Sequence, residues 1–476
     1  MENTKKINWY TLAFMAFSTV WAFGNVLNGF VYFNGIQVIF SWILMFALYF
    51  VPYALMVGEL GSAFKHSGGG VSSWIHETIS PKFAYYAGWT YWACHVTYIA
   101  SKGSGGLKAL SWMIFQDGTT YDTFPTLWVQ LATLLVLLFF CWVASRGLNP
   151  LKKLATIAGT SMFVMSILYI LMMFAAPVIN PGGGYVTADF SIGNLIPKFN
   201  VGYFTSLSIL VFAVGGCEKI SPYVNKVKDP SRGFPKGMIM LAVMVMVCAI
   251  LGTIAMGMMF DPALINESGE SFNSYVSNGS YWAFERLGEY YGVGNLLMII
   301  YAACNAIGQF STLVLSIDAP LRMLLDNEDA RQFIPTKLLK KNKYDAYING
   351  IWMVVILSGS IILIQSLVPG AASVLAQLNK LNSVTMPLRY LWVFTAYLAL
   401  RRSLDRFNPE YQFTKNGLAL TAGVWCFIVT AACCIMGMYV EGDLASTLLN
   451  VITPFVLTAL GLILPIIKRR EVNSHV

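Results

Sequence analysis

Apolar stretches of about 20 residues recur along the whole chain, and they restrict its fold more than any other feature. A helix of that length crosses the roughly 30 Å of hydrocarbon in a bilayer. Only helices and closed barrels satisfy every backbone hydrogen bond inside lipid. We expect about twelve membrane-spanning helices, at residues 9–33, 36–63, 82–116, 126–145, 153–177, 200–225, 237–260, 292–325, 346–366, 370–400, 415–439 and 448–468.

The composition agrees with a membrane protein and excludes a soluble one. Hydrophobic residues make up 57% of the 476 residues and charged residues 11%, which is more apolar surface than a water-soluble fold can cover. No linker separates the apolar stretches, so we predict an all-α polytopic membrane protein with a single transmembrane domain over residues 1–476, in contact with the lipid bilayer. The first stretch is longer than a signal-peptide core and lacks a small-residue cleavage site, so we expect it to stay as a helix.

Lysine and arginine residues predict the orientation of the chain. They collect in every second loop, for example at 226–236, 331–343 and 401–415, whereas the opposite loops are mainly acidic. Because basic loops resist translocation, we expect a multi-pass protein of the cell membrane with both termini in the cytoplasm. The net charge of +8 is then explained by the basic loops expected on the cytoplasmic side. Since no basic stripe with interleaved aromatic residues occurs, we expect no nucleic-acid partner. The sequence leaves the oligomeric state open.

Neither the cysteines nor the histidines are arranged as metal ligands. All 8 cysteines fall inside predicted spans and the 4 histidines are scattered, so we interpret the cysteines as small core residues. A membrane metalloenzyme needs clustered ligands. We therefore predict no metal site, no cofactor, no catalytic residue and no enzymatic activity.

Two spans are interrupted by residues that weaken a helix. These residues are Gly24, Asn25, Asn28 and Gly29 in the first span and Gly215, Gly216 and Pro222 in the sixth. Unwound backbone at membrane depth persists only where protein or a cavity satisfies it. Helices interrupted at corresponding positions of two halves indicate the binding site of a transporter. Glycines that only allow close helix packing are the alternative.

The interrupted spans are five apart, as expected for inverted five-helix repeats with broken helices 1 and 6. We expect a first repeat over residues 1–199, a second over 200–400, and two peripheral helices within 401–476. Between the seventh and eighth spans, we expect a short amphipathic helix near residues 281–291, lying over the outer face.

Three segments carry recognisable motifs. They are "VNKVKDPSRGFPKGM" at 224–238, "VPYALMVGELGSAFKHSGGGVSSW" at 51–74 and "GNVLNGFVYFNG" at 24–35. With these segments the chain resembles the amino acid–polyamine–organocation superfamily of transporters, and it is most similar to the glutamate/GABA antiporter branch. It departs from the pattern at Asp229, where an asparagine before the proline is usual, and at 24–26, where many relatives have a Gly-Ser-Gly-type motif.

The resemblance implies a leucine-transporter-like fold that works by alternating access around a site at the middle of the membrane. In such proteins the two broken helices receive the amino and carboxylate groups of the substrate. The corresponding residues here are Gly24, Asn25, Val26, Val214, Gly215, Gly216 and Cys217. General physics agrees, because helix N-termini attract a carboxylate and freed carbonyls attract an ammonium group.

Charged residues inside the predicted spans are costly, and each is a functional hypothesis. Glu218 either holds a network together or carries a proton, and Lys219 either pairs with an acid on another helix or balances a substrate carboxylate. Adjacent helical residues do not face each other, so we expect no simple bridge between these two. The other intramembrane charges are Lys102, Lys108, Asp318, Lys380 and Arg389, with Glu59 and Arg322 near cytoplasmic ends, where they can reach water.

Two of these charges are spaced to form a pair. Several uncharged side chains are further candidates for the binding site. Asp318 and Arg322 are spaced i, i+4 and are expected to pair. Tyr98 in the third span could form a substrate wall or simply pack. Asn305 and Gln309 in the eighth could bind substrate or a neighbouring helix. Excess positive charge at depth favours acidic or zwitterionic substrates over polyamines, and the alternative is that Lys102 and Lys108 reach the outer headgroups.

The function that we predict is secondary amino-acid transport. We favour an antiporter that exchanges an amino acid for a related amino acid or for its decarboxylated amine. Proton- or sodium-coupled symport is the alternative, and Ser311 and Thr312 of the eighth span keep sodium open. A non-transporting nutrient sensor is a third hypothesis of another class.

Overall fold

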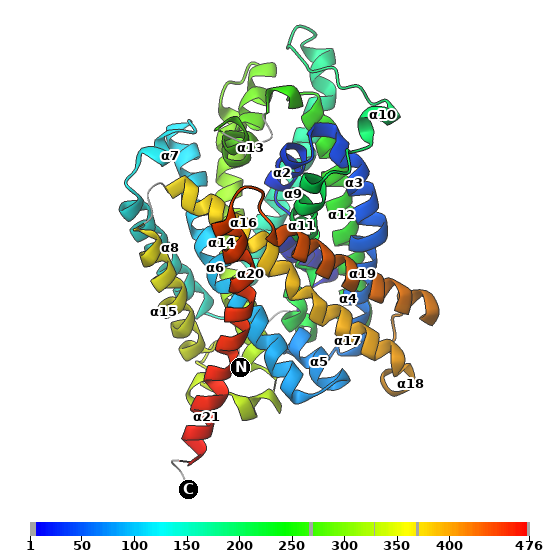
Figure 1. The fold of residues 1–476 in the computed structure, drawn as a ribbon, viewed down its shortest axis with the longest axis vertical. Coiled ribbons are helices and arrows are strands. Elements are labelled where there is room, and N and C mark those ends of the chain that lie inside the picture. The colour runs from blue at the N-terminus through cyan, green and yellow to red at the C-terminus, as the bar shows by residue number, and fades with distance from the viewer. Residues whose placement is uncertain (1–5, 266–269, 328, 368–370, 474–476) are drawn as a thin grey trace.

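A computed structural model of the protein describes residues 6–265, 270–327, 329–367 and 371–473. Within these ranges the regular structure is helical, apart from two isolated β-bridges that join Ile7 to Val227 and Lys341 to Tyr347. The longer helices run along the vertical axis of Figure 1, many of them obliquely.

The helices up to residue 195 contain the first interrupted span. They are α1 (Trp9–Val20), α2 (Gly24–Tyr32), η1 (Gly35–Gln37), α3 (Val38–Met45), the π-helical turn η2 (Phe46–Phe50), α4 (Val51–Ala63), α5 (Val71–Thr78), α6 (Pro81–Phe115), α7 (Thr120–Thr123), α8 (Thr126–Ala144), α9 (Leu148–Ile179) and α10 (Ile192–Leu195).

The helices after residue 200 contain the second interrupted span. They are α11 (Val201–Val214), η3 (Cys217–Lys226), α12 (Pro230–Gly257), η4 (Pro262–Leu264), α13 (Glu270–Tyr290), α14 (Leu296–Leu325), η5 (Asp329–Phe333), η6 (Thr336–Leu339), α15 (Ile348–Gln365), α16 (Ala371–Leu388), α17 (Tyr390–Arg402), α18 (Leu404–Phe407), α19 (Asn416–Met438), α20 (Leu444–Ala459), η7 (Leu460–Leu462) and α21 (Ile463–Asn473).

Nine helical stretches in the described ranges are long and apolar enough to cross a membrane, or ten when α1 and α2 count as one bent span. The nine are Gly35–Ala63, Thr126–Ala144, Leu148–Ile179, Val201–Lys226, Pro230–Gly257, Leu296–Leu325, Ile348–Gln365, Asn416–Met438 and Leu444–Asn473. The remaining two expected spans coincide with α6, which contains several lysines, and with α16 and α17, which meet at Arg389. An all-helical polytopic membrane protein is confirmed, whereas the number twelve and the division into two inverted repeats stay predictions.

The first span is broken, as predicted, but the break covers residues 21–23, before the glycines and asparagines that we expected to form it. α1 ends at Val20, α2 begins at Gly24, and the two helices are bent by 41°. Asn28 and Gly29 lie inside α2, so the prediction that they unwind is wrong. A Cβ atom on Gly29 would lie 3.0 Å from the ring of Trp42. This glycine therefore allows close packing, which is the alternative role of glycine in membrane helices.

The break in the sixth span lies at Gly215 and Gly216, as predicted. α11 ends at Val214, and the chain continues from Cys217 as the 3₁₀-helix η3. Gly216 has a φ angle of +103°, a conformation that side chains strongly disfavour. A Cβ atom on Gly215 would lie 2.2 Å from the ring of Tyr390. Both positions therefore require glycine.

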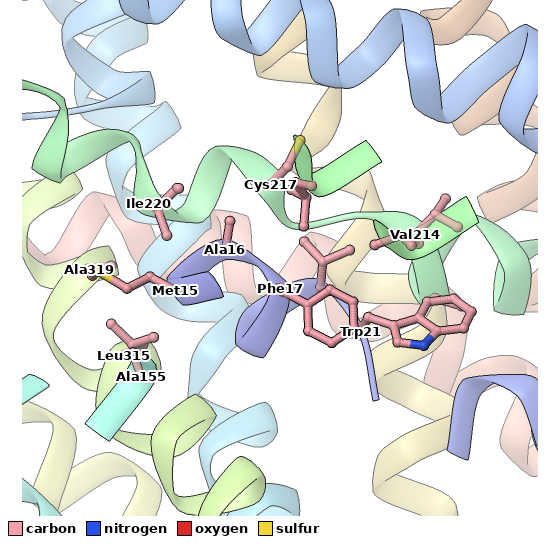
Figure 2. Close-up of a cluster of buried hydrophobic side chains, with 14 of the residues drawn as sticks. Met15, Ala16, Phe17, Trp21, Ala155, Val214, Cys217, Ile220, Leu315 and Ala319 are labelled. Carbon is pink, nitrogen blue, oxygen red and sulfur yellow. The ribbon is translucent and has the colours of Figure 1, made fainter. Parts of the chain in front are cut away.

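The two broken spans pack against each other through an apolar cluster, which is part of the buried core. α1 contacts η3, α9, α12 and α14, and α14 packs along α6. Figure 2 shows the cluster where these helices meet, with Met15 and Ala16 of α1, Ile220 of η3, and Leu315 and Ala319 of α14. Each of these side chains is fully buried.

Both ends of the chain lie toward the same end of the molecule. The N and C marks are in the lower half of Figure 1, where α5, α18 and α21 also lie, and α7, α10 and α13 lie toward the top. The N–H of Ile7 donates to the carbonyl of Lys226 at 2.8 Å, which ties the start of α1 to the basic loop after η3. The cytoplasmic location of this end stays a prediction, and we call the opposite end, with α7 and α13, the outer end.

The segment between α12 and α14 forms a longer helix than the short one expected near 281–291. α13 covers Glu270–Tyr290 and packs against α2, α9 and α14. Its first half is polar, "ESFNSYVSNGS", so the apolar pattern alone gave no sign of it. The buried side chains of Tyr281, Phe284 and Leu287 attach the helix to the bundle. α13 thus covers the central helices at the outer end.

An ion-pair network joins α14 to neighbouring segments near its inner end. Arg322 Nε lies 2.8 Å from Asp318 Oδ2, so the predicted i, i+4 pair is confirmed. The same carboxylate oxygen accepts a hydrogen bond from Tyr223 Oη of η3 at 2.7 Å. Arg322 also contacts Asp326 at 3.5 Å and Asp345 at 3.3 Å. This network connects the second half of the sixth span to the eighth.

Glu59 is buried, which contradicts the expectation that it reaches water at the cytoplasmic surface. Its Oε2 atom lies 2.5 Å from Arg401 Nη2, and neither side chain is exposed. The same oxygen accepts hydrogen bonds from Tyr397 Oη at 3.2 Å and from the Phe413 N–H at 2.9 Å. These partners come from segments far along the chain, so local sequence could not identify them.

We expect Arg401→Met to lower the free energy of unfolding by about 3–5 kcal/mol, because it leaves a buried carboxylate without its cation. The neighbouring Arg402 is exposed, and Arg402→Met is the matched control with little expected effect. Thermal unfolding in detergent, followed by a dye that reacts with the buried cysteines, measures both. Equal unfolding temperatures for the two variants would contradict a stabilising role of the pair.

Candidate functional site

A cavity of about 60 Å³ lies where the two broken spans meet. Its walls come from α1 and the first break, from α11 and the second break, and from α6, α14, α16 and α17. The described residues that line it are Ser18, Thr19, Val20, Trp21, Ala22, Asn25, Tyr98, Lys102, Phe212, Ala213, Gly215, Gly216, Lys219, Thr312, Met386, Arg389 and Tyr390. We call it the central cavity.

Side-chain hydrogen bonds connect the two breaks to each other and to α14 around the central cavity. Asn25 Nδ2 donates to the carbonyl of Ala213, near the end of α11, at 3.2 Å. Thr312 Oγ1 of α14 donates to the carbonyl of Ser18 on α1 at 2.8 Å. These bonds satisfy carbonyls close to the ends of two helices, which lipid could not do. They fix the spacing between the two breaks and α14.

The predicted site residues fall into three groups. Asn25, Tyr98, Gly215, Gly216 and Lys219 line the central cavity.

The second group lines a neighbouring cavity nearer the outer end, and the third lines neither. Gly24, Asn305 and Gln309 belong to the second group. The third group consists of Val26, Val214, Cys217 and Glu218, each fully buried in the protein. Val214 and Cys217 flank the glycine break, where their side chains pack into the apolar cluster of Figure 2.

Two lysines flank the ring of Tyr98. Lys102 Nζ lies 4.9 Å from the ring centroid and Lys219 Nζ lies 5.1 Å from it. Lys219 also donates a 2.6 Å hydrogen bond to Ser316 Oγ, and only 2% of Lys219 is exposed. The aromatic face and the hydroxyl stabilise the ammonium groups only in part. In the described part of the chain, neither lysine forms an ion pair within 4 Å.

Glu218 lies behind the central cavity and interacts with Arg389. Glu218 Oε1 lies 3.5 Å from Arg389 Nε, and the other oxygen accepts a hydrogen bond from Tyr53. The Arg389 guanidinium also contacts the ring of His95 and lies 5.0 Å from the ring centroid of Tyr91. As expected, Glu218 does not bridge to Lys219. Its negative charge instead helps to hold an arginine that lines the cavity.

The central cavity is therefore strongly positive. Lys102, Lys219 and Arg389 line it, and no acidic residue is among its described lining residues. Glu218, behind Arg389, is the nearby counter-charge. Such a cavity is electrostatically complementary to an anionic ligand.

Sequence reasoning missed some of the lining residues. Arg389 was noted only as an intramembrane charge, and Tyr390 and Met386 were not noted at all, although all three line the central cavity. Arg389 lies at the junction of α16 and α17. Its charge inside an apolar span was the one signal that could have identified it.

The described residues contain no group of three or more His, Cys, Asp or Glu side chains that could hold a metal ion. The two hydroxyl residues considered for sodium both lie on α14. Thr312 Oγ1 bonds to carbonyls of α1 and of its own helix, at 2.8 Å to Ser18 and 2.9 Å to Gly308. Ser311 Oγ is buried and has no hydrogen-bond partner among the described residues.

Comparisons with known proteins agree with this architecture. The chain matches the family model described as "Amino acid permease" over residues 7–466. It is 47% identical to the "Aspartate/glutamate permease AcaP" of Lactococcus lactis subsp. cremoris, over 98% of this chain and 96% of the relative. It is 24% identical to the "Inner membrane transporter YjeM" of Escherichia coli K12, over 89% of this chain and 88% of the relative.

A more distant relative is the "Probable agmatine/putrescine antiporter AguD" of Lactococcus lactis subsp. lactis. The identity is 21%, over 78% of this chain and 74% of the relative. The family model covers nearly the whole chain, and with it the two broken spans and the cavity between them. The predicted superfamily, transporter class and absence of enzymatic activity are thereby confirmed: the chain belongs to the amino acid permease family.

Proposed function

We propose that this protein transports the acidic amino acids aspartate and glutamate across the membrane by alternating access. The observation that carries the proposal is the excess of cationic side chains around the central cavity, where Lys102, Lys219 and Arg389 have no acidic counterpart in the lining. The printed name of the relative at 47% identity, an aspartate/glutamate permease, supports the same substrate class.

The backbone of the two breaks suits the amino-acid end of the substrate. Residues at the carbonyl ends of α1 and α11 line the cavity, and such helix ends attract an ammonium group. The N–H groups of Asn25 and Val26 at the start of α2 donate to the carbonyls of Ala22 and Phe23, at 2.9 and 3.0 Å, so the positive end of the α2 dipole, rather than free N–H groups, attracts the α-carboxylate. These contacts are common to all amino acids, so they explain binding but give no preference for a particular side chain.

The two lysines beside Tyr98 suit the second carboxylate. The Lys102 and Lys219 ammonium groups lie on the same ring and lack acidic partners in the described structure. A substrate carboxylate would supply the missing counter-charge, whereas an amide would not. A cationic amine such as a diamine would be repelled. Aspartate and glutamate therefore fit the cavity better than their amides or polyamines do.

For the coupling mode, we propose exchange with a related amino acid. The resemblance to the glutamate/GABA antiporter branch supports exchange, and an empty positive cavity would make reorientation without an anion unfavourable. Symport driven by sodium or protons is the second candidate, and the buried Ser311 hydroxyl, which has no hydrogen-bond partner among the described residues, favours sodium.

We expect purified protein in liposomes to take up labelled aspartate and glutamate. Unlabelled aspartate should compete strongly, whereas asparagine and putrescine should compete weakly, because they lack the second carboxylate or carry added positive charge. Liposomes without protein give the background. Equal competition by aspartate and asparagine would contradict the proposed substrate class.

We expect Lys219→Gln to lower aspartate uptake about 10-fold or more, since one charge-assisted hydrogen bond contributes about 1.5–3 kcal/mol. Uptake of asparagine should fall much less, and Lys219→Arg should restore part of the aspartate preference. Lys380→Gln is the matched control, because Lys380 is exposed and lies outside the central cavity lining. The measurement is the ratio of aspartate to asparagine uptake in protein of verified thermal stability. An unchanged ratio in Lys219→Gln would remove Lys219 from the site.

We expect liposomes preloaded with unlabelled aspartate or glutamate to accumulate labelled aspartate faster than empty liposomes do. Exchange predicts this trans-stimulation without any ion gradient. Imposed sodium or pH gradients across empty liposomes test the second candidate. Equal uptake by empty liposomes under such a gradient would refute obligatory exchange and favour symport.

A further inference from the structure

A second cavity of about 130 Å³ lies on the outer side of the central cavity. α6, α13 and α14 form most of its walls, and the first break and α16 complete them. It shares Ala22 and Lys102 with the central cavity, so the two spaces meet at the first break. Both exceed the roughly 10–15 Å³ that one water molecule requires. We call the second space the outer cavity.

Lys108 is a cationic residue that lines the outer cavity but not the central cavity. Only 3% of it is exposed, and its ammonium group donates a hydrogen bond to Ser277 of α13. The ammonium lies 5.8 Å from the ring centroid of Tyr121. The exposed carboxylate of Asp122 acts on it only at longer range, because no ion pair within 4 Å joins the two residues. A buried ammonium without a close carboxylate favours binding of an anion.

The walls around Lys108 are held in place by stacked aromatic rings and amide bonds. Tyr281 stacks on Trp112 with the ring centroids 4.8 Å apart. Asn305 Nδ2 donates to Tyr281 Oη at 2.9 Å, and Gln309 Nε2 donates to Asn305 Oδ1 at 3.4 Å. Pre-positioned polar groups bind a ligand at a lower entropic cost. The arrangement is therefore a built pocket whose polar groups face a common space.

Gly24 lines the outer cavity and has free space next to it. A Cβ atom built on Gly24 would have no heavy atom within 4 Å. This glycine was expected to bind substrate in the central site, and the structure instead places it in the lining of the outer cavity. A side chain introduced here would project into free space, so position 24 is suited to a reporter group.

We propose that the outer cavity is a second binding site for an acidic amino acid, with Lys108 holding a carboxylate and Lys102 passing the ligand on to the central cavity. This inference rests on the proposed function, because it takes its ligand from there. The shared lining at Lys102 gives a continuous series of cations from Lys108 to Lys219. The outer site raises the local concentration of the anion next to the central site.

The test uses Gly24→Cys as a reporter of occupancy in the outer cavity. The full-length variant is placed in lipid nanodiscs, and the rate of its labelling by a maleimide is measured with and without aspartate. The parent chain, with its eight free cysteines, gives the background labelling. A second variant combines Gly24→Cys with Lys219→Gln, which weakens the central site, so that protection can be assigned to the outer one.

We expect aspartate to slow labelling of the cysteine at position 24 in both variants. Adding Lys108→Gln should raise the half-protecting aspartate concentration about 10-fold or more, because a charge-assisted contact is lost. Lys380→Gln in the same background is the matched control and should leave this concentration unchanged.

Several outcomes would overturn the outer site. They are protection that disappears with Lys219→Gln, protection that persists without Lys108, equal protection by sodium chloride at the same ionic strength, and a cysteine at position 24 that does not react. Uptake by the unmodified protein is measured in parallel. Normal aspartate uptake together with any of these outcomes refutes the outer site alone, whereas absent aspartate and glutamate uptake refutes the proposed function.

Discussion

The structure depends on one constraint, that backbone leaving the helical conformation inside a bilayer must find its hydrogen-bond partners within the protein. Each unsatisfied group costs several kcal/mol in hydrocarbon. The two breaks satisfy this constraint by hydrogen bonds to each other and to α14, the eighth span. Asn25 donates to Ala213 across the breaks, and Thr312 donates to Ser18 near the end of α1. These bonds satisfy carbonyl groups near two helix ends, and the central cavity lies where the two breaks meet.

Burying charged side chains is the second energetic cost. Paired and unpaired charges lie in different parts of the protein. Near the inner end, Arg322 contacts carboxylates, and Arg401 pairs with Glu59. Around the cavities, the close partners of Lys102, Lys108 and Lys219 in the described structure are hydroxyl groups and aromatic rings, and the positive charge is compensated only from a distance, by Asp122 and Glu218. Removing one partner of a buried charge pair destabilises the scaffold, whereas unpaired cations around a cavity lower the free energy of an anionic ligand.

The two sides of the central cavity differ in packing. On the side of the chain termini, the apolar cluster of Figure 2 fills the space between α1, η3 and α14, and Tyr223 of η3 bonds to Asp318 of α14. On the other side, the outer cavity continues from Ala22 and Lys102. Under the alternating access that we propose, the apolar cluster would separate while the outer walls close, and the half-helices on either side of the breaks would tilt.

The amino-acid sequence by itself determined the membrane class, nearly all helix positions and the glycine break at Gly215 and Gly216, because hydrophobic length and backbone preference are local properties. It also determined the i, i+4 pair of Asp318 and Arg322. It misplaced the first break, since a glycine that permits close packing and one that permits unwinding look the same in a sequence. Only the tertiary structure decided that Glu218 faces Arg389 and that Glu59 pairs with Arg401, 342 positions away. It alone divided the predicted site residues between two cavities, because which side chains share a space depends on helix packing across the whole chain.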